Sequence, residues 1–276
     1  MKRAGDAYFE LRRRLAASPS ADLDAELLLA HVLGCSRTAL ATAPERELND
    51  TQAKALMELA TRRSDGEPVA YLTGQRAFWT LELEVTRDVL VPRPETELLV
   101  ETTLEELQTV ARPAVLDLGT GSGAIALAIA SERPDALVTA VDRSAAALAV
   151  AARNSKRLQI GNVRFLVGSW YQPASALRFH AVVANPPYVA EDDPLLAALA
   201  HEPRTALVAG PEGLDALAEI CAGARQHLAA GGLLIVEHGA SQGAAVRAMV
   251  TGAGLCRVAT LNDLEGLPRA TRGSAD

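Results

Sequence analysis

Apolar residues in the first quarter of the chain recur at helical spacing. Leu23, Leu27 and Leu28 fall on one face of a helix, which is the period expected of an amphipathic helix packed on a core. Turn-forming residues interrupt the pattern at 18–20 and at 43–44. The pattern therefore predicts a small helical bundle, and we assign residues 1–70 to an N-terminal helical domain.

The pattern changes between residues 71 and 95. Apolar and polar residues alternate over 81–85, and a second apolar run at 89–91 precedes Pro92-Arg93-Pro94. Alternation with a period of two is typical of a strand with one buried face. We interpret residues 71–95 as a β-hairpin bridge between two domains.

Beyond residue 96, short apolar runs alternate with helical segments, a rhythm that predicts an α/β domain over residues 96–276 with a mostly parallel sheet and helices on both faces. Strands are expected at 114–118, 136–141, 163–167, 180–184 and 233–236, and helices starting near 122, 144, 213 and 241. The helix from 213 should run to 229 and end at Gly231-Gly232. An antiparallel edge pair is expected at 257–261 and after Pro268.

The segment Asn185-Pro186-Pro187-Tyr188 follows the apolar run 181–184. It should lie at the carboxyl end of a strand, where open α/β sheets place their chemistry. The two prolines stiffen the loop and aim the Asn185 carboxamide and nearby carbonyls. Such acceptors suit a planar NH2 group, and the Tyr188 ring would stack on the flat substrate that carries it.

A glycine-rich loop, Gly119-Thr120-Gly121-Ser122-Gly123, joins a buried strand to a helix. This geometry lets a ligand approach the backbone and the helix N-terminus. The dinucleotide fingerprint G-x-G-x-x-G requires a glycine at position 124, where this chain has Ala124. A nicotinamide or flavin cofactor is therefore disfavoured.

Asp142 ends the next strand, 23 residues after Gly119. A carboxylate there can accept hydrogen bonds from both hydroxyls of a ribose, although a helix cap before Ser144 is the alternative. The glycine loop, this acid and the Asn185 loop at successive strand ends favour S-adenosylmethionine as the nucleoside.

Composition narrows the possible partners. The chain of 276 residues has a formal net charge of −7, which argues against a broad nucleic-acid-binding face because phosphate binding depends on clustered Lys and Arg. Cys35, Cys221 and Cys256 have no metal-ligand spacing. No apolar run reaches the roughly 18 residues of a membrane span. We expect a cytoplasmic protein with no metal, no membrane partner and no stable nucleic-acid partner.

The chain resembles the HemK/PrmC family, the methyltransferases that modify the glutamine of the Gly-Gly-Gln loop in class I peptide chain release factors. The resemblance covers nearly the whole sequence. It is carried by residues 61–68, 74–79, Val91-Pro92-Arg93-Pro94-Glu95-Thr96-Glu97, the loop at 117–123, residues 185–188 and Glu237-His238-Gly239. It implies a class I S-adenosylmethionine-dependent, Rossmann-like fold whose helical domain helps to bind the release factor.

The resemblance also implies roles for individual residues. Gly119, Thr120, Gly121, Ser122 and Gly123 would line the methionine and ribose end of the cofactor. Asp142 would hold the ribose, Trp170 would cover the adenine, and Asn185 would meet both cofactor and substrate. Asn185, Pro186, Pro187 and Tyr188 would form the glutamine site. Many members carry an acidic residue before the tryptophan, where this chain has Ser169.

The implied reaction gives S-adenosyl-L-homocysteine and a methylated amide. An amide nitrogen is a weak nucleophile, so Asn185 and the Pro186 carbonyl would hold its two hydrogens and aim its lone pair at the methyl group. Tyr188 completes the predicted catalytic set. We leave open whether Phe78, Arg93 and Glu95 wall the glutamine pocket. His238 is interpreted as structural, and the acidic residues 191–193 as a solvated loop or helix start.

Three other functions compete with glutamine methylation as an interpretation of this sequence. An adenine amino-group methyltransferase acting on DNA or RNA would use the same Asn185 chemistry but would have to flip a base and bind phosphates. A nicotinamide oxidoreductase would leave the Asn185 loop unexplained. A non-catalytic release-factor clamp would make no use of the cofactor and amine sites.

Overall fold

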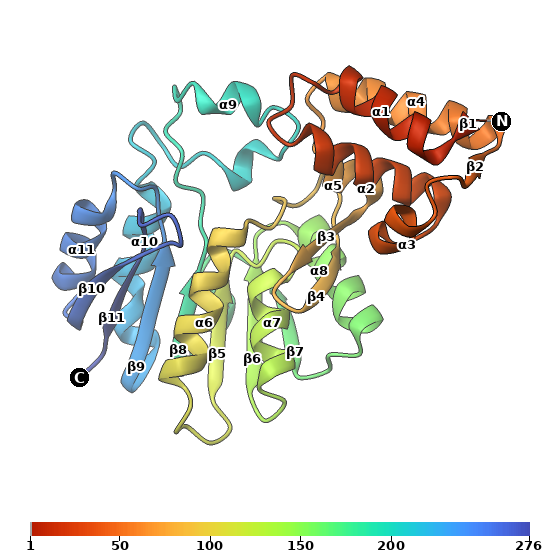
Figure 1. Cartoon of the computed structure of the whole chain (residues 1–276). Coiled ribbons are helices and arrows are strands. Elements are labelled where there is room, and N and C mark those ends of the chain that lie inside the picture. The colour runs from red at the N-terminus through yellow and green to blue at the C-terminus, as the bar shows by residue number, and fades with distance from the viewer. Residues whose placement is uncertain (1) are drawn as a thin grey trace. The chain divides into compact units, whose positions relative to one another are not determined.

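The computed structural model describes residues 2–276. The chain divides into two compact units at Gln75 and Arg76 (Figure 1). We call residues 2–75 the helical unit and residues 76–276 the sheet unit. Residues 76–95, predicted as part of a bridge, belong by their contacts to the sheet unit.

The helical unit contains five helices and a short strand pair. They are α1 (Ala4–Arg14), α2 (Ala21–Leu33), α3 (Arg37–Thr42), α4 (Asp50–Ser64), α5 (Val69–Thr73), β1 (Lys2–Arg3) and β2 (Glu47–Leu48). Leu28 and Leu29 of α2 are fully buried in its core. At the start of α4 the Asn49 side chain accepts from the Gln52 amide while the Gln52 side chain accepts from the Asn49 amide, so two otherwise unpaired amides are satisfied.

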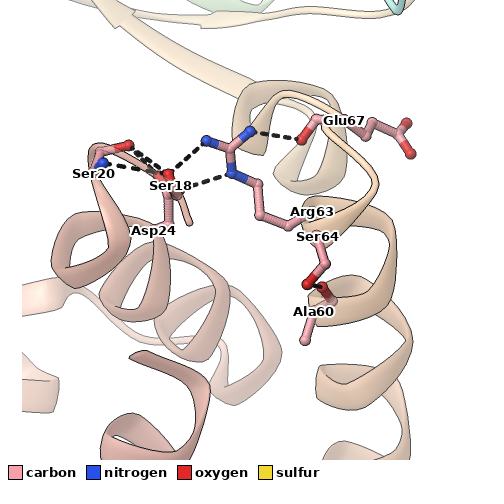
Figure 2. Close-up of polar contacts among 7 residues, drawn as sticks. All are labelled: Ser18, Ser20, Asp24, Ala60, Arg63, Ser64 and Glu67. Carbon is pink, nitrogen blue, oxygen red and sulfur yellow. Dashed lines mark hydrogen bonds and ion pairs between the residues drawn. The ribbon is translucent and has the colours of Figure 1, made fainter. Parts of the chain in front are cut away.

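A polar cluster ties α2 to α4 within this unit (Figure 2). Arg63 donates through Nε to Asp24 at 2.7 Å and through Nη2 to the Ser18 hydroxyl at 2.9 Å. Its Nη1 donates to the Glu67 carbonyl at 3.3 Å. The Ser18 and Ser20 hydroxyls also donate to Asp24. Because the Asp24 side chain is only 5% exposed, these partners replace the water that would otherwise stabilise a carboxylate.

A two-stranded sheet opens the sheet unit, formed by β3 (Gln75–Phe78) and β4 (Leu81–Glu84). The prediction of a strand at 89–91 is wrong, because that segment lies outside any strand. Val89 and Val91 are buried nonetheless, and the Val91 amide donates to the Glu202 carboxylate at 3.0 Å instead of to a neighbouring strand. The apolar run therefore marks burial, not strand pairing.

The main sheet has seven strands in the order β10-β11-β9-β8-β5-β6-β7. Their bounds are β5 (Ala114–Leu118), β6 (Leu137–Asp142), β7 (Val163–Val167), β8 (Phe179–Ala184), β9 (Leu228–Glu237), β10 (Cys256–Asn262) and β11 (Pro268–Ser274). The five from β9 to β7 run parallel, while β11 is antiparallel to its two neighbours, β9 and β10. This confirms the predicted mostly parallel sheet with an antiparallel pair at one edge.

Helices cover both faces of this sheet (Figure 1). They are α6 (Glu97–Glu106), α7 (Ala124–Glu132), α8 (Ala145–Leu158), α10 (Asp215–His227) and α11 (Gly243–Gly252), with the short α9 (Leu195–Ala198) in a loop. Val115 of β5 packs in one core with α6 and α7, whereas the next residue, Leu116, packs in a second core with α10 and α11. Successive strand residues thus alternate between two buried layers.

The boundary between α10 and β9 differs from the prediction. The helix ends at His227, and the strand begins at Leu228 and includes Gly231 and Gly232. Pairing with β8 shifts within this segment, since Phe179 faces Leu228 but Ala181 faces Leu233. The glycines therefore form an irregularity inside the strand instead of a helix stop, and Gly231 has φ +71°.

We expect Asp24→Ala to lower the unfolding free energy of the helical unit by about 3 kcal/mol, because it leaves the mostly buried Arg63 guanidinium without its anionic partner. Asp22→Ala is the matched control, since its ion pair with Arg12 is exposed and should contribute less than about 1 kcal/mol. Hydrogen exchange of amides in α2 and α4 measures both. Equal effects of the two substitutions would contradict the assignment.

Candidate active site

Three strands of the sheet unit end level at one edge. Leu118 at the end of β5 pairs with Val141 of β6 and with Ala184 of β8. The loops that follow them border a cavity of about 460 Å³, within the usual range for small-molecule sites. Its lining includes the predicted residues Gly119, Thr120, Gly121, Ser122, Asp142, Trp170, Asn185 and Pro187.

The glycine loop has a backbone that side chains rarely adopt. Gly121 has φ +55° and Gly123 has φ +85°. A Cβ on Gly123 would lie 3.0 Å from Leu127 Cδ1 and 3.1 Å from Ala151 Cβ. Gly123 is not part of the cavity lining, so its requirement for glycine comes from its positive φ and from the packing of α7 against α8. Its predicted contact with a cofactor has no support from this geometry.

The amides of the glycine loop are already used within the protein. Those of Gly119 and Thr120 donate to the Val141 carbonyl at 2.8 and 3.0 Å, and that of Gly121 donates to Asp142 Oδ2 at 2.9 Å. A loop that binds pyrophosphate needs its amides directed at the ligand. This arrangement favours a ligand without phosphate at this point and counts against the dinucleotide alternative.

Asp117 anchors the loop from below. Its side chain is fully buried, and its Oδ2 accepts from the Thr120 hydroxyl at 2.6 Å and from the Ala126 amide at 3.2 Å. Its Oδ1 has no partner among the described residues. Burial raises the pKa of Asp117 to about 7, although both hydrogen bonds oppose the change.

Asp142 lies between the glycine loop and α8. Its Oδ2 holds the Gly121 amide, and its Oδ1 accepts from the Ser144 amide at 2.8 Å. Ser144, not Asp142, caps α8 through a bond from the Ala147 amide. A carboxylate has about four acceptor positions, so two remain for a ligand in the cavity that Asp142 lines.

Trp170 borders the same cavity in an unusual conformation. Its φ is +43°, which is rare for a bulky residue and is found mainly at functional sites. The turn before it is shaped by Gly168, where a Cβ would lie 2.9 Å from Pro173. Ser169, which replaces the acidic residue common in the resembled family, also lines the cavity.

Asn185 is connected to a buried carboxylate by two hydrogen bonds. Its Nδ2 donates to the Thr96 hydroxyl at 3.0 Å, and that hydroxyl donates to Glu237 Oε2 at 2.7 Å. The Tyr188 hydroxyl donates to Glu237 Oε1 at 3.0 Å. Thr96 ends the 3-10 turn Pro94–Thr96 and Glu237 ends β9, so segments distant in sequence meet at Asn185.

Tyr188 is held in a way that the sequence did not suggest. Its hydroxyl is bound to Glu237, its carbonyl accepts from Gln242 Nε2 at 3.0 Å, and its ring packs against the core of the sheet unit. Neither Tyr188 nor Pro186 belongs to the cavity lining. The expected stacking of the Tyr188 ring on a substrate is therefore not what this geometry provides, and burial raises its pKa.

The three residues left open as pocket walls behave differently from one another. Phe78 is 1% exposed within the core of the sheet unit and lines no part of the cavity. Arg93 lines the cavity and donates to Glu202 Oε1 at 2.5 Å. Glu95 is half-buried and lies outside the lining. Of the three, Arg93 is the one that lines this cavity.

His238 fits the structural role expected of it. It is fully buried, its Nδ1 donates to the Gly239 carbonyl, and its Nε2 accepts from the Thr271 hydroxyl. Burial lowers its pKa, which favours the neutral ring. Among residues 2–276 no group of three acidic, histidine or cysteine side chains is placed to hold a metal ion, and the absence of a metal stays a prediction.

Thr96 and Glu237 lie in two of the motifs that carry the family resemblance, but the sequence alone assigns neither of them a role. A signal for Glu237 is present, because a carboxylate directly follows the buried apolar run 233–236, and such a group needs partners. Thr96 has no comparable signal, since its part depends on a contact across 89 residues of sequence.

Comparisons with known proteins agree with this site. Residues 6–74 match the family model of the PrmC N-terminal domain, and residues 94–213 match that of the methyltransferase small domain. A release factor glutamine methyltransferase of Burkholderia pseudomallei is 51% identical over 267 residues, covering 94% of each chain. The chain belongs to the release factor glutamine methyltransferase family. A relative from Xylella fastidiosa is 49% identical over 253 residues, covering 91% of this chain and 92% of its own.

The solved structures show the same fold. A methyltransferase from Pyrococcus furiosus covers 82% of this chain and 98% of its own with a TM-score of 0.52 and 16% identity. As a member of this family, the chain has the predicted class I S-adenosylmethionine-dependent methyltransferase fold with an N-terminal helical part. No helix within residues 2–276 is both long and apolar enough to cross a membrane.

The raised pKa of Asp117 predicts that the stability of this protein depends on pH. Between the ordinary value of 3.8 and about 7, the folded chain retains a proton that the unfolded chain has lost, so stability should fall as the pH rises through this window. Asp117→Asn should remove this contribution, which amounts to at most about 4 kcal/mol.

Urea unfolding of both proteins from pH 4 to 8 measures the difference. The control is Asp135→Asn, because hydrogen bonding with Arg133 lowers the pKa of Asp135 to about 2. Its stability contribution is lost only as the pH falls below 3.8, so its curve should stay parallel to wild type over this range. A parallel curve for Asp117→Asn would refute the assignment.

Proposed function

We propose that this chain transfers a methyl group from S-adenosylmethionine to the side-chain amide nitrogen of the glutamine in the Gly-Gly-Gln loop of class I release factors. The observation that carries the proposal is the fixed Asn185 carboxamide. Its NH2 is bound to Thr96, which leaves Oδ1 to accept a hydrogen from a substrate amide. Asn185 lines the same cavity as Asp142 and the glycine loop, so methyl donor and acceptor would meet there.

The chemistry of the cavity wall fits this cofactor. Two acceptor positions of Asp142 suit the two ribose hydroxyls, and the partly exposed Trp170 ring offers a flat face for adenine. The internally bonded loop amides suit a ligand without phosphate. When bound, S-adenosylmethionine supplies a methyl group on a sulfonium, which is transferred without a metal.

The residues of this chain act by positioning the amide. Asn185 Oδ1 accepts one amide hydrogen, so that the nitrogen lone pair points toward the methyl group. The Pro186 carbonyl is proposed to accept the other, although Pro186 is not among the residues that line the cavity. Withdrawal of density onto the carbonyl oxygen weakens the nucleophile, and acceptors on both hydrogens favour density on nitrogen. The proton leaves after transfer, when the methylated nitrogen has become acidic.

We assign the helical unit to recognition of the release factor, as the match of residues 6–74 to the PrmC N-terminal domain supports. The predicted division into 1–70, 71–95 and 96–276 remains a proposal, as does a cytoplasmic location. The main rival, an adenine amino-group methyltransferase, needs the same acceptors but also contacts to phosphates. The net charge of −7 supports the protein substrate.

Transfer of labelled methyl groups tests the substrate. We expect wild type to label a purified class I release factor, with label lost when the loop glutamine of the substrate is changed to alanine. Asn185→Ala should lower kcat by about 100-fold or more, as expected when one oriented hydrogen-bonding group is removed. Unmethylated DNA and tRNA are the comparison substrates, and labelling of either with an inert release factor would establish the rival.

Binding of nucleosides tests the role of Asp142. Wild type should bind adenosine about 100-fold more tightly than 2′,3′-dideoxyadenosine, since two hydrogen bonds to a charged acceptor contribute about 1.5 kcal/mol each. In Asp142→Ala both nucleosides should bind equally. Binding of the dideoxy compound reports any collapse of the glycine loop in the variant. If Asp142→Ala still preferred adenosine over 2′,3′-dideoxyadenosine as strongly as wild type does, ribose recognition by this residue would be excluded.

A further inference from the structure

Glu237 is a buried carboxylate that contacts the site only through other side chains. It is 1% exposed, and its two oxygens receive the hydroxyls of Thr96 and Tyr188. It does not line the cavity. We propose that Glu237 is a positioning residue that fixes, through Thr96, which end of the Asn185 carboxamide faces the substrate. The proposal rests on the proposed function, because it concerns the orientation of the same amide-binding group.

The argument follows from the number of hydrogens available. An ionised carboxylate can only accept hydrogen bonds, so the single hydroxyl hydrogen of Thr96 must be donated to Glu237. Only lone pairs of the Thr96 oxygen then remain for Asn185, and these bind NH2 and repel a carbonyl oxygen. The carboxamide is therefore held with Nδ2 on Thr96, as observed, and its Oδ1 points away from that contact.

The reversed orientation would abolish the site. Asn185 would then present NH2 to the NH2 of the substrate, and two donors cannot bond to one another. Without a charged acceptor behind Thr96, nothing prevents the hydroxyl from donating to Asn185 Oδ1 and stabilising this reversed state. One fixed charge two hydrogen bonds away thus sets the polarity of the acceptor that receives the substrate.

The same carboxylate restrains the other end of the loop. Tyr188 donates to Glu237, so a single anion holds Asn185 indirectly and Tyr188 directly on either side of the two prolines. The titratable or charged groups that act on it are Tyr188, Arg269 and Glu95. Burial raises the pKa of Glu237, while its two hydroxyl partners and Arg269 favour the charged form. Protonation in acid would let the carboxyl donate to Thr96 and release the constraint.

Three substitutions separate the relay from simple packing. Thr96→Val keeps the shape of the side chain but removes the hydroxyl, and it should lower kcat by about 100-fold. Glu237→Gln keeps the shape but can donate to Thr96, and it should cause a similar loss. Thr96→Ser retains the hydroxyl and should keep kcat within about threefold. Because Thr96 and Asn185 both line the cavity, kcat is measured at saturating S-adenosylmethionine in all three, so that a change in cofactor Kd does not enter the comparison.

Thr103→Val is the matched control. Thr103 is a fully buried threonine of α6 whose hydroxyl donates to the Leu99 carbonyl, so it loses the same chemical group without touching the relay. It should leave kcat unchanged, and the melting temperatures of the two variants are measured alongside so that loss of stability is separated from loss of transfer. Equal losses of kcat in the two variants would show that buried threonine hydroxyls matter only for folding, and would overturn the proposal.

Coupling to Asn185 gives a second readout. Thr96→Val should add less than about threefold to the loss already caused by Asn185→Ala, because residues that act through one another are not additive. Multiplication of the two losses would refute the relay. The acid limb of the kcat profile should also be present in wild type and absent in Glu237→Gln.

The outcomes separate this inference from the proposed function. Wild-type methylation of the release factor with a fully active Glu237→Gln would overturn the relay and leave the function intact. An inert release factor with labelled nucleic acid would overturn the function, and the variants would then be measured on that substrate. Loss of transfer there in Glu237→Gln and Thr96→Val would still support positioning of Asn185, and its retention would reject it.

Discussion

Coverage of the parallel strands on both faces is the constraint on which the site depends. Neighbouring residues such as Val115 and Leu116 are buried in different cores, so a shift of one residue in strand pairing would exchange the two layers. The register is thereby fixed, and β5, β6 and β8 end at the same level. The loops that follow these strands therefore start from one edge of the sheet, because packing of the two cores fixes the strand register.

Two buried carboxylates stabilise the glycine loop and the Asn185 loop at this edge of the sheet. Asp117 receives the Thr120 hydroxyl beneath the glycine loop, and Glu237 receives the Thr96 hydroxyl beside Asn185. In both cases a buried acceptor orients a threonine, and the threonine orients a loop. The charged form of each acid is opposed by burial, so loop order is obtained at a cost in stability that hydrogen bonds offset only in part.

Much of the fold could be predicted because it depends on local pattern. The strand runs 114–118 and 163–167 were placed correctly from apolar runs flanked by turn residues. The predictions were wrong where a buried segment does not pair with a strand, or where pairing is irregular. Residues 89–91 are apolar and buried without forming a strand. The Gly231-Gly232 pair interrupts the pairing of β9 with β8 without ending the strand. Sequence patterns report burial, whereas pairing depends on which partner lies alongside.

The candidate site shows the same division. Gly121, Asp142 and Asn185 follow predictable strands, and their convergence could be foreseen from strand order. The positions of Tyr188 and Thr96 could not, since each depends on a hydrogen bond to Glu237 from a distant segment. Residues that touch a ligand can be recognised by their chemistry, but those that orient them are defined only by their neighbours.

The packing of Gly123 has a consequence for reading variation among relatives. A Cβ on Gly123 would lie 3.0 Å from Leu127 Cδ1 and 3.1 Å from Ala151 Cβ, so any larger residue would strain the packing of α7 against α8 whether or not a ligand is bound. Evolution would therefore preserve this glycine even in a descendant that had lost its cofactor. Retention of Gly123 in a relative therefore reports on the packing of α7 against α8 and is not by itself evidence that the relative still binds the cofactor.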